Sequence, residues 1–436
     1  MSLIELLREA SWCDLPPSVQ QMSKRCLLDL VGVAAAGATT PLSSIIRDHA
    51  SKHFGAGGTS ARMLFDGRAV SPAGAALAGG MTIDAIDAHD GYPGVKGHAG
   101  CGLLPALLAI AEDRNPSGAE FLTVLALGYE VSIRAGLNLH RTVADYHTSG
   151  AWVAVGIAAV AGRLLGLTQQ QTRHAMGIAE YHGPRSQMMR CIDHPTMLKD
   201  GSGWGAMAGT SAAYLAEDGF TGAPAITVEG AEEFSDLGHR WMILEQYFKP
   251  YPVCRWAQPP VECARQLRRD NDFSAADITA IRTHTFHEAA RLSTPAPKDT
   301  EQAQYSLPFA VAAFLVRGTI GAAEVGEDGL NDPEIARLSH LFTPVEDQRF
   351  NAVFPEERWA RLEIDLANGR TLTSEDHVAH GNAENPLSDE EIDAKFEVFM
   401  SGAGMAARAG RINAVIDVLD TADDLAELMD MITAPA

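Results

Sequence analysis

Residues 89–100, HDGYPGVKGHAG, carry an unusual density of reactive side chains. Two histidines, an aspartate and a lysine lie there among four glycines, between two alanine- and leucine-rich segments with helical spacing. Loops on rigid scaffolds are where binding and catalytic groups concentrate, so the stretch predicts a site. A plain helix–helix connection with exposed histidines is the alternative.

Two further clusters interrupt the apolar background. Within residues 187–209, Arg190, His194 and Lys199 lie close together, ahead of three glycines and another alanine-rich helix. A lysine just before a helix start, beside free backbone N–H groups, predicts an anion site. The stretch KPYPVCRWAQPP, residues 249–260, brings Lys249 and Arg255 to a junction between two segments of different character, a favoured place for ligands.

His147 lies in DYHTSGAW, just before a helix of buried character for which Thr148 or Ser149 could serve as N-cap. Taken alone, it fits a helix-start residue without a chemical task. The acidic stretch DAIDAHD places Asp84 and Asp87 one helical turn apart, with Asp90 close behind. These carboxylates could bind a divalent cation, although a solvated acidic helix end explains them equally.

The sequence lacks the motifs of several common kinds of catalytic or binding site. It contains no P-loop, no G-x-S-x-G nucleophile elbow and no zinc-ligand spacing. Aspartate, histidine, lysine and arginine on separate loops suit proton transfer at a carbon next to a carboxylate. Cations neutralise the anionic substrate and the developing enolate, and a histidine moves the proton near neutral pH.

Composition limits the partners. The chain has 436 residues, with 34 Lys+Arg against 56 Asp+Glu and a formal net charge of −22. This balance argues against nucleic acid or an anionic membrane surface, because both require basic patches. The six scattered cysteines, the polar acidic N-terminus and apolar runs shorter than the ~20 residues of a membrane span predict a cytoplasmic protein.

The periodicity predicts a mainly α protein. Residues 1 to about 250 read as successive helices, ITAIRTHTF predicts a strand, and RWARLEIDLANGRTLTSED predicts a hairpin about Asn368-Gly369. One strong helix is expected over TEQAQYSLPFAVAAFLVRG between them. We predict a large all-helical domain over 1–254, an inserted smaller α+β domain over 255–390, and C-terminal helices over 391–436 that return to the helical domain.

These clusters, in this order, resemble the MmgE/PrpD family, which includes 2-methylcitrate dehydratase, cis-aconitate decarboxylase and iminodisuccinate epimerase. The likeness spans most of the chain and includes DAHDGYPGVKGHAGCG for the family's acidic motif and loop histidine, KPYPVC, and YSLPFAVAAF. It implies an all-helical domain with an α+β lid, a homodimer, and chemistry without metal or organic cofactor.

The resemblance also assigns roles. It implies that Asp87, His98, His147 and Lys199 are catalytic. We expect a second group to bind the substrate, namely Asp90, Lys96, Arg190, Arg255 and Gln258. Four features depart from the family pattern: His89 replaces an acid, His98-Ala99-Gly100 replaces H-P-S, KDGSGWG replaces the K-P-x-H-x-G setting of the lysine, and Gln258 replaces a histidine that looks like part of the family's site.

The sequence therefore predicts an enzyme acting on a small di- or tricarboxylate. His98 or His147 would abstract a proton α to a carboxylate, Asp87 would orient that histidine, and dehydration, decarboxylation or epimerisation would follow. Two alternatives remain. Gln258 motivates a non-catalytic dimeric ligand-binding or scaffold protein of the same fold, and Asp84, Asp87 and Asp90 motivate a metal-dependent hydrolase.

Overall fold

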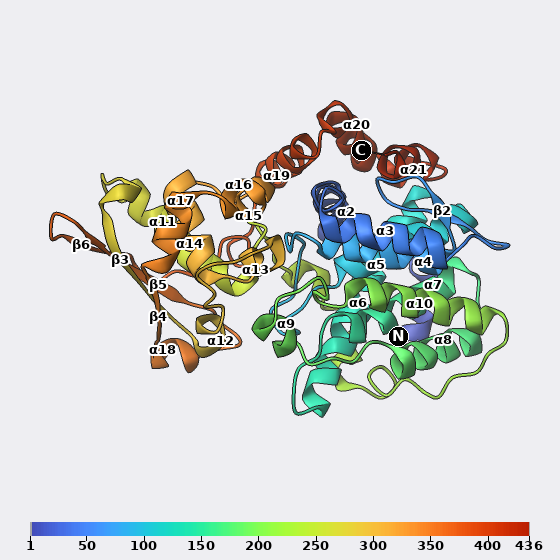
Figure 1. Ribbon diagram of the computed structural model, residues 1–436. Helices are drawn as coiled ribbons and strands as arrows, with labels where there is room; N and C mark the ends of the chain where they lie inside the picture. Colours follow the sequence, from blue (N-terminus) through green and yellow to red (C-terminus); the bar gives the residue numbers. More distant parts are fainter. Residues whose placement is uncertain (1, 436) are drawn as a thin grey trace.

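Alanine- and glycine-rich helices pack against one another in an N-terminal lobe of the computed structural model, which describes residues 2–435 (Figure 1). The long buried helices lie at its centre and α8 on one side. The elements are α1 (Leu3–Glu9), α2 (Pro17–Gly37), α3 (Pro41–His53), β1 (Ala61–Arg62), β2 (Ala69–Val70), α4 (Pro72–Asp84), α5 (Gly100–Arg114), α6 (Gly118–Thr142), α7 (Gly150–Leu164), α8 (Gln169–His182), α9 (Met189–Asp193) and α10 (Ser202–Glu217).

Small residues let the starts of α7 and α10 meet. A Cβ built on Gly205 would lie 2.5 Å from the Gly150 backbone, so only glycine permits this approach. The contact brings Ser149, just before α7, within 2.8 Å of the Asp200 carboxylate, just before α10. Ser149 occupies the predicted N-cap position but makes no side-chain cap bond, because its hydroxyl bonds to Asp200 instead.

The C-terminal lobe is built around a mixed sheet of order β4-β3-β5-β6. Its strands are β3 (Ile278–Thr285), β4 (Phe342–Glu346), β5 (Ala360–Leu366) and β6 (Thr371–Thr373), with β3 parallel to β4 and antiparallel to β5. The predicted strand at 278–286 and the hairpin about Asn368-Gly369 are confirmed, since β5 pairs antiparallel with β6 and Gly369 has φ +84°.

The helices of this lobe are α11 (Gln258–Asp270), α12 (His287–Ala290), α13 (Thr300–Gln304), α14 (Leu307–Arg317), α15 (Ala322–Val325), α16 (Glu327–Leu330), α17 (Pro333–His340) and α18 (Gln348–Asn351). Of these, α11, α14 and α17 lie on the side of the sheet that faces the N-terminal lobe (Figure 1). The prediction of one helix over 300–318 is wrong. Ser306 caps a new helix by accepting from the Phe309 N–H, and Pro308, which favours a helix start, follows at once.

The chain ends by returning to the first lobe. The helices α19 (Asp389–Gly402), α20 (Ala406–Asp417) and α21 (Ala426–Thr433) run back across the top of Figure 1, and α19 packs on α2. Their buried side chains, such as Phe396 and Ile412, belong to the same core as α2, α5 and α6. A separate core fills the C-terminal lobe and also includes Ile192 of α9 and Val253, before the predicted boundary at 255.

The predicted mainly α fold is confirmed over residues 2–435. Among these residues no single helix is both long and apolar enough to span a membrane, and α2 and α3 pass that test only as a pair bent by 92°.

Candidate active site

The loop between α4 and α5, residues 85–99, lies where the two lobes meet. Its Gly91 exchanges two backbone hydrogen bonds with Tyr247, at 3.0 and 2.8 Å. Three cationic side chains donate to carbonyls of this loop. Lys249 binds the Asp87 carbonyl at 2.8 Å, Lys395 of α19 binds that of Ala88 at 2.7 Å, and Arg358 binds that of Pro93 at 2.9 Å. The polar loop predicted as a site is therefore fixed from three distant parts of the chain.

A small buried cavity, here called the inner cavity, collects reactive side chains from this loop and from the C-terminal lobe. Its volume is about 20 Å³, room for about one water molecule. Its lining residues are Asp87, Lys96, His98, Met188, Ile192, Tyr247, Lys249, Cys254, Arg255, Trp256, Tyr305 and Arg358. Of the nine residues predicted to act in catalysis or binding, four line it: Asp87, Lys96, His98 and Arg255.

His98 is held in one orientation. Its ring nitrogen Nδ1 contacts the Asp90 carbonyl, and its backbone N–H donates to Ser149 Oγ at 2.9 Å. A carbonyl oxygen only accepts, so Nδ1 carries the hydrogen and Nε2 of the neutral ring keeps its lone pair. Burial, aided by the positive charge of Lys249, holds the pKa of His98 well below its usual 6.5. The imidazole is therefore neutral at physiological pH and can accept a proton.

Asp87 pairs with Lys249, and its more distant contact with a histidine, 3.9 Å, is with His89. Its carboxylate lies 2.7 Å from Lys249 Nζ, and both side chains are almost completely buried. Burial disfavours the charge on Lys249, but the adjacent Asp87 and Tyr247 outweigh it and raise the Lys249 pKa. The sequence analysis expected Asp87 to orient the catalytic histidine, whereas Asp90 and Ser149 hold His98 instead.

Three cations at the mouth of the inner cavity have no acidic partner. Lys96, Arg255 and Arg358 form no salt bridge with any carboxylate of residues 2–435. Arg255 donates to Gln258 Oε1 and to the His380 carbonyl, at 2.7 and 2.9 Å, and the buried Nε of Arg358 has no hydrogen-bond partner there. Burial lowers the pKa of Arg255 to about 10. A buried cation without a counter-ion is costly, as for Arg255 and Arg358, and a bound anion would offset that cost.

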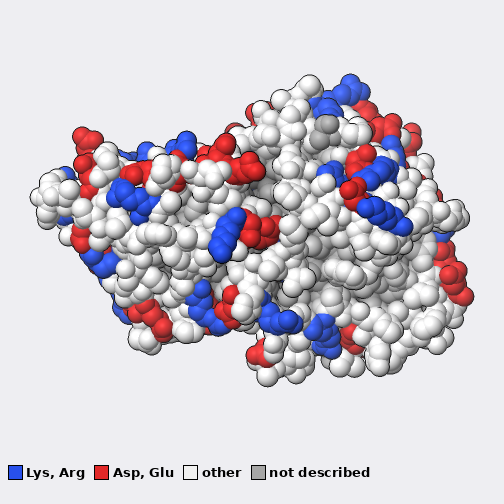
Figure 2. Space-filling view, viewed as in Figure 1, with Lys and Arg blue, Asp and Glu red and all other residues white. Residues whose placement is uncertain are grey.

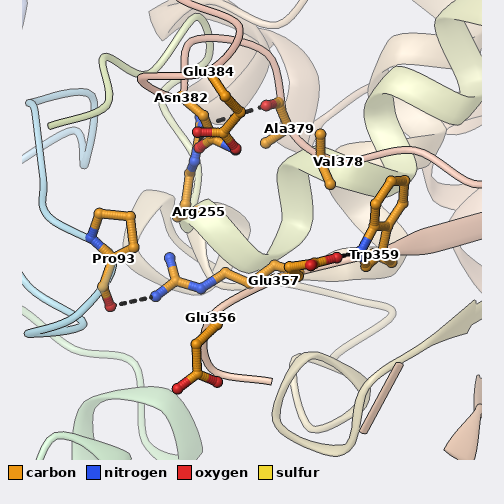
Figure 3. A pocket seen from close by; sticks show the side chains of 10 residues that line it. Pro93, Arg255, Glu356, Glu357, Trp359, Val378, Ala379, Asn382 and Glu384 are labelled. Carbon is orange, nitrogen blue, oxygen red and sulfur yellow. Dashed lines mark hydrogen bonds between the residues drawn. The ribbon is translucent and has the colours of Figure 1, made fainter. Parts of the chain in front are cut away.

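A second hollow, the outer cavity, adjoins the inner one and shares Arg255 and Arg358 with it. It has a volume of about 510 Å³ and is otherwise lined by Pro93, Glu356, Glu357, Trp359, Val378, Ala379, Asn382 and Glu384. Figure 3 shows Arg255 and Pro93 at one end of it and Trp359 at the other. Arg358 lines both cavities and donates to the Pro93 carbonyl at 2.9 Å.

Lys199 lies close to the inner cavity but does not line it. Its ammonium donates to Gln304 Oε1 and lies 5.0 Å from the ring centroid of Tyr305, which does line that cavity. Lys199 also lines a hollow of about 450 Å³, the side cavity, together with Arg190 and His194. Short helix α9 separates the two hollows, because Ile192 faces the inner cavity and Cys191 the side cavity.

His147 lines neither hollow. It is half-buried, its backbone N–H donates to His140 Nε2 at 3.1 Å, and it pairs with Gln187 in an isolated bridge. The structure therefore brings His98 and Asp87 together, places Lys199 behind Tyr305, and leaves His147 apart from them. Arg190 is exposed on the far side of α9 from His98.

The side chains of Asp90 and Gln258 are buried and bond to other groups of the protein. The Asp90 carboxylate accepts from the Tyr129 hydroxyl and from the Gly100 N–H, and burial raises its pKa to about 6. The Gln258 amide donates to two carbonyls at 3.1 Å and accepts from Arg255, so the residue that replaces the family histidine holds Arg255 in place. Neither side chain lines the inner cavity.

The donor atoms of Asp87, His89 and His98 lie within 4.8 Å of one another, as a metal site would require. The Lys249 ammonium already binds Asp87, however, and a cation there repels a metal ion. Each of the three aspartates considered for a hydrolase has a near partner of its own: Asp84 contacts His89, Asp87 contacts Lys249 and Asp90 contacts Tyr129. His89 also lies 3.9 Å from Asp87. This geometry does not favour a metal centre.

Backbone strain marks the same region. Asp87, Lys96 and Lys199 adopt φ values of +50°, +51° and +49°, a conformation that costs non-glycine residues energy. Such strain persists where the surroundings impose it and is common at functional sites.

From the sequence, no role was assigned to several residues that lie at or near the inner cavity. Lys249 was visible in KPYPVC as a cation at a junction, and Tyr305 lies in the quoted YSLP stretch, but neither received a role. Arg358 and Tyr247 carry no local signal, because each reaches the cavity from an irregular segment. Asp200 was read only as part of the glycine-rich stretch after Lys199.

Two family models match this chain. Residues 2–238 match the MmgE/PrpD N-terminal domain, and residues 251–421 match the MmgE/PrpD C-terminal domain. Human cis-aconitate decarboxylase is 24% identical over 441 residues, covering 94% of this chain and 89% of its own. The enzyme of that name from Aspergillus terreus (strain NIH 2624 / FGSC A1156) is 24% identical over 472 residues, covering 97% and 93%.

A mitochondrial 2-methylcitrate dehydratase from Yarrowia lipolytica is 26% identical over 247 residues, which cover 50% of this chain and 47% of that one. These relatives are enzymes, a decarboxylase and a dehydratase by name. With both domain models matched along nearly its whole length, the chain belongs to the MmgE/PrpD family.

Proposed function

We propose that the protein is a lyase or isomerase acting on a small di- or tricarboxylate by removing a proton from the carbon α to a carboxylate. The observation that carries this proposal is the group of cations without acidic partners, Lys96, Arg255 and Arg358, around the neutral imidazole of His98. In a chain of net charge −22, such a group is best explained by an anionic ligand. The names of the decarboxylase and dehydratase relatives point to the same substrate class.

In the proposed reaction, Arg255 and Arg358 bind substrate carboxylates and hold the α carbon over His98. His98 Nε2 takes the proton, and the electron pair left behind moves into the adjacent carboxylate to give an enediolate. Nearby cations stabilise that charge. The intermediate then loses hydroxide, which leaves as water with the proton that His98 has taken, or it regains a proton on either face. In decarboxylation the bonding pair stays on carbon as CO₂ leaves, and that carbon takes a proton which His98 first accepts from water.

The inner cavity, at about 20 Å³, is too small for a tricarboxylate, so we further propose that the C-terminal lobe acts as a lid. Arg358 bonds the Pro93 carbonyl across the two lobes, and releasing this bond would join the inner cavity to the outer one. A substrate carboxylate would then replace Pro93 as the partner of Arg358.

We expect Arg358→Gln to raise KM by about tenfold to a hundredfold, because a charge-assisted hydrogen bond to a carboxylate contributes about 1.5–3 kcal/mol. The value of kcat should change less, since His98 is untouched. Steady-state kinetics on the purified variant measure both. Arg370→Gln, at the exposed turn of the hairpin, is the matched control and should behave as wild type. An unchanged KM in the Arg358 variant would contradict a role in binding.

Incubation in deuterated water tests the proposed function directly. The candidate acids are cis-aconitate, 2-methylcitrate, citrate, tartrate and iminodisuccinate, read out by NMR and mass spectrometry. A catalyst introduces deuterium at the carbon α to a carboxylate, in the recovered acid or in its product. Binding of an acid without any exchange would favour the non-catalytic alternative, and activity lost to a chelator and restored by a divalent cation would favour the hydrolase.

We also propose that the chain forms a homodimer. A group of large apolar side chains is exposed on or beside α8 and α10, namely Tyr181, Leu198, Trp204, Leu215, Phe220 and Ile226. Figure 2 shows a broad area with few charged side chains over this part of the N-terminal lobe. Exposed apolar patches of this kind mark association surfaces. Light scattering should give twice the 46.5 kDa chain mass.

A further inference from the structure

Asp200 is a buried carboxylate that the reaction described above does not use. The residue is 1% exposed and lies between Lys199 and the start of α10. Its backbone is fixed at both ends, because its N–H donates to Asp84 Oδ2 at 3.2 Å and its carbonyl accepts from the Gly150 N–H at 3.2 Å. The position of the side chain is therefore set by α4 and α7 together.

The Asp200 carboxylate faces His98. Its Oδ2 lies 3.7 Å from His98 Nε2 and accepts a hydrogen bond from Ser149 Oγ at 2.8 Å. The same Ser149 oxygen accepts from the His98 backbone N–H at 2.9 Å, so one hydroxyl ties the two residues together. The other oxygen, Asp200 Oδ1, is buried and has no hydrogen-bond partner among residues 2–435.

Proton abstraction creates a charge that needs a counter-ion. When His98 Nε2 takes a proton, the ring becomes an imidazolium in a buried site that already contains the Lys249 ammonium. The other carboxylates nearby are engaged: Asp87 with Lys249, Asp84 with His89, and Asp90 with Tyr129. Asp200 has no cationic side chain bonded to it: Oδ1 has no hydrogen-bond partner among residues 2–435, and Oδ2 lies 3.7 Å from the nitrogen that would become charged.

We propose that Asp200 is the positioning residue of His98: held by Ser149, its carboxylate is the counter-ion of the imidazolium formed when Nε2 accepts the substrate proton. The covalent change is confined to that proton, which leaves carbon and binds Nε2, while the Asp200 carboxylate, 3.7 Å away, stabilises the new positive charge without taking the proton. This inference rests on the proposed function, in which His98 is the base. It also gives a task to the aspartate that follows the lysine in this chain, where the family pattern has proline.

The charge state of Asp200 makes this arrangement dependent on pH. Burial, aided by the negative charges of Asp84 and Asp87, raises the pKa of Asp200 to about 7. The other titratable or charged groups around it are His89, His98, Cys101, Tyr146, Cys191, Lys199, Cys254 and Tyr305. Below about pH 7 Asp200 gains a proton and the counter-ion is lost, whereas His98, with its lowered pKa, stays neutral. Activity should therefore fall on the acid side with a midpoint near 7.

The test compares Asp200→Asn with wild type over pH 5–9. Asparagine keeps the shape and accepts from Ser149, but it cannot carry the charge. We expect kcat to fall by about tenfold to a hundredfold, as expected for lost charge stabilisation, KM to change little, and the acid limb near pH 7 to disappear. Asp218→Asn, at the exposed end of α10, is the matched control. An unchanged kcat, or a lower kcat with the acid limb intact, would overturn the proposal.

A second variant and an NMR titration test the pairing of Asp200 with His98 independently. Ser149→Ala retains Asp200 but removes a hydrogen bond that favours its charged form, so the acid limb should move to higher pH. NMR of ¹⁵N-labelled histidine in the substrate-free protein, with the His98 signal assigned by His98→Asn, should show a shift of Nε2 centred near pH 7. A flat His98 signal contradicts the pairing, whereas failure of wild type to turn over any acid counts only against the proposed function.

Discussion

His98→Asn is expected to lower kcat by about a thousandfold, the centre of the range for loss of a general acid–base group. Asparagine fills similar space and its amide can still donate to the Asp90 carbonyl, so the loop should keep its shape. It cannot take a proton near neutrality. The measurement is steady-state turnover of whichever acid exchanges deuterium with wild type, together with that exchange itself.

His340→Asn, at an exposed position at the end of α17, is the matched control for the His98 variant. His147→Asn separates the two histidines that the sequence offered as bases. If the His98→Asn variant keeps its turnover and the His147→Asn variant loses it, the base has been assigned to the wrong residue. Circular dichroism and thermal melting of all three variants show whether loss of activity reflects loss of fold.

Lys249→Met is expected to cost both stability and activity. It leaves the buried Asp87 carboxylate without its partner, and breaking a buried ion pair in this way costs about 3–5 kcal/mol. It also removes the ammonium that binds the Asp87 carbonyl and so anchors the loop carrying His98. We expect a thermal midpoint lower by several degrees and no measurable turnover at pH 7–8, where the raised pKa of Lys249 keeps the wild-type lysine charged.

A double variant distinguishes the two consequences. Asp87→Asn with Lys249→Met removes both charges, so no uncompensated carboxylate remains and most of the stability should return. Turnover should stay absent, because the loop loses its anchor and the cavity loses its polar pair. Lys298→Met, an exposed lysine of the C-terminal lobe, is the control for lysine removal. A double variant no more stable than Lys249→Met would show that the pair is not what stabilises this region.

The local pattern of the chain was enough to predict much of the architecture. Helical periodicity predicts the N-terminal helices, and alternation with an Asn-Gly turn predicts the β5–β6 hairpin, because both signals arise between neighbours in sequence. The break between α13 and α14 was missed, since no glycine separates the two helices and Ser306 was not recognised as a cap. Glycines and polar residues between helices likewise indicated the loop that contains Asp87 and His98.

The sequence by itself thus determined the family resemblance, the mainly helical fold and the loop that carries the reactive side chains. Only the tertiary structure decided which charges meet. It paired Asp87 with Lys249, placed Asp200 beside His98, brought Arg358 from a distant segment, and left His147 apart. The physical reason is that periodicity determines which face of a helix is buried but not where side chains on irregular loops point. Those directions follow from long-range contacts, such as the close approach of Gly150 and Gly205 that sets Ser149 against Asp200.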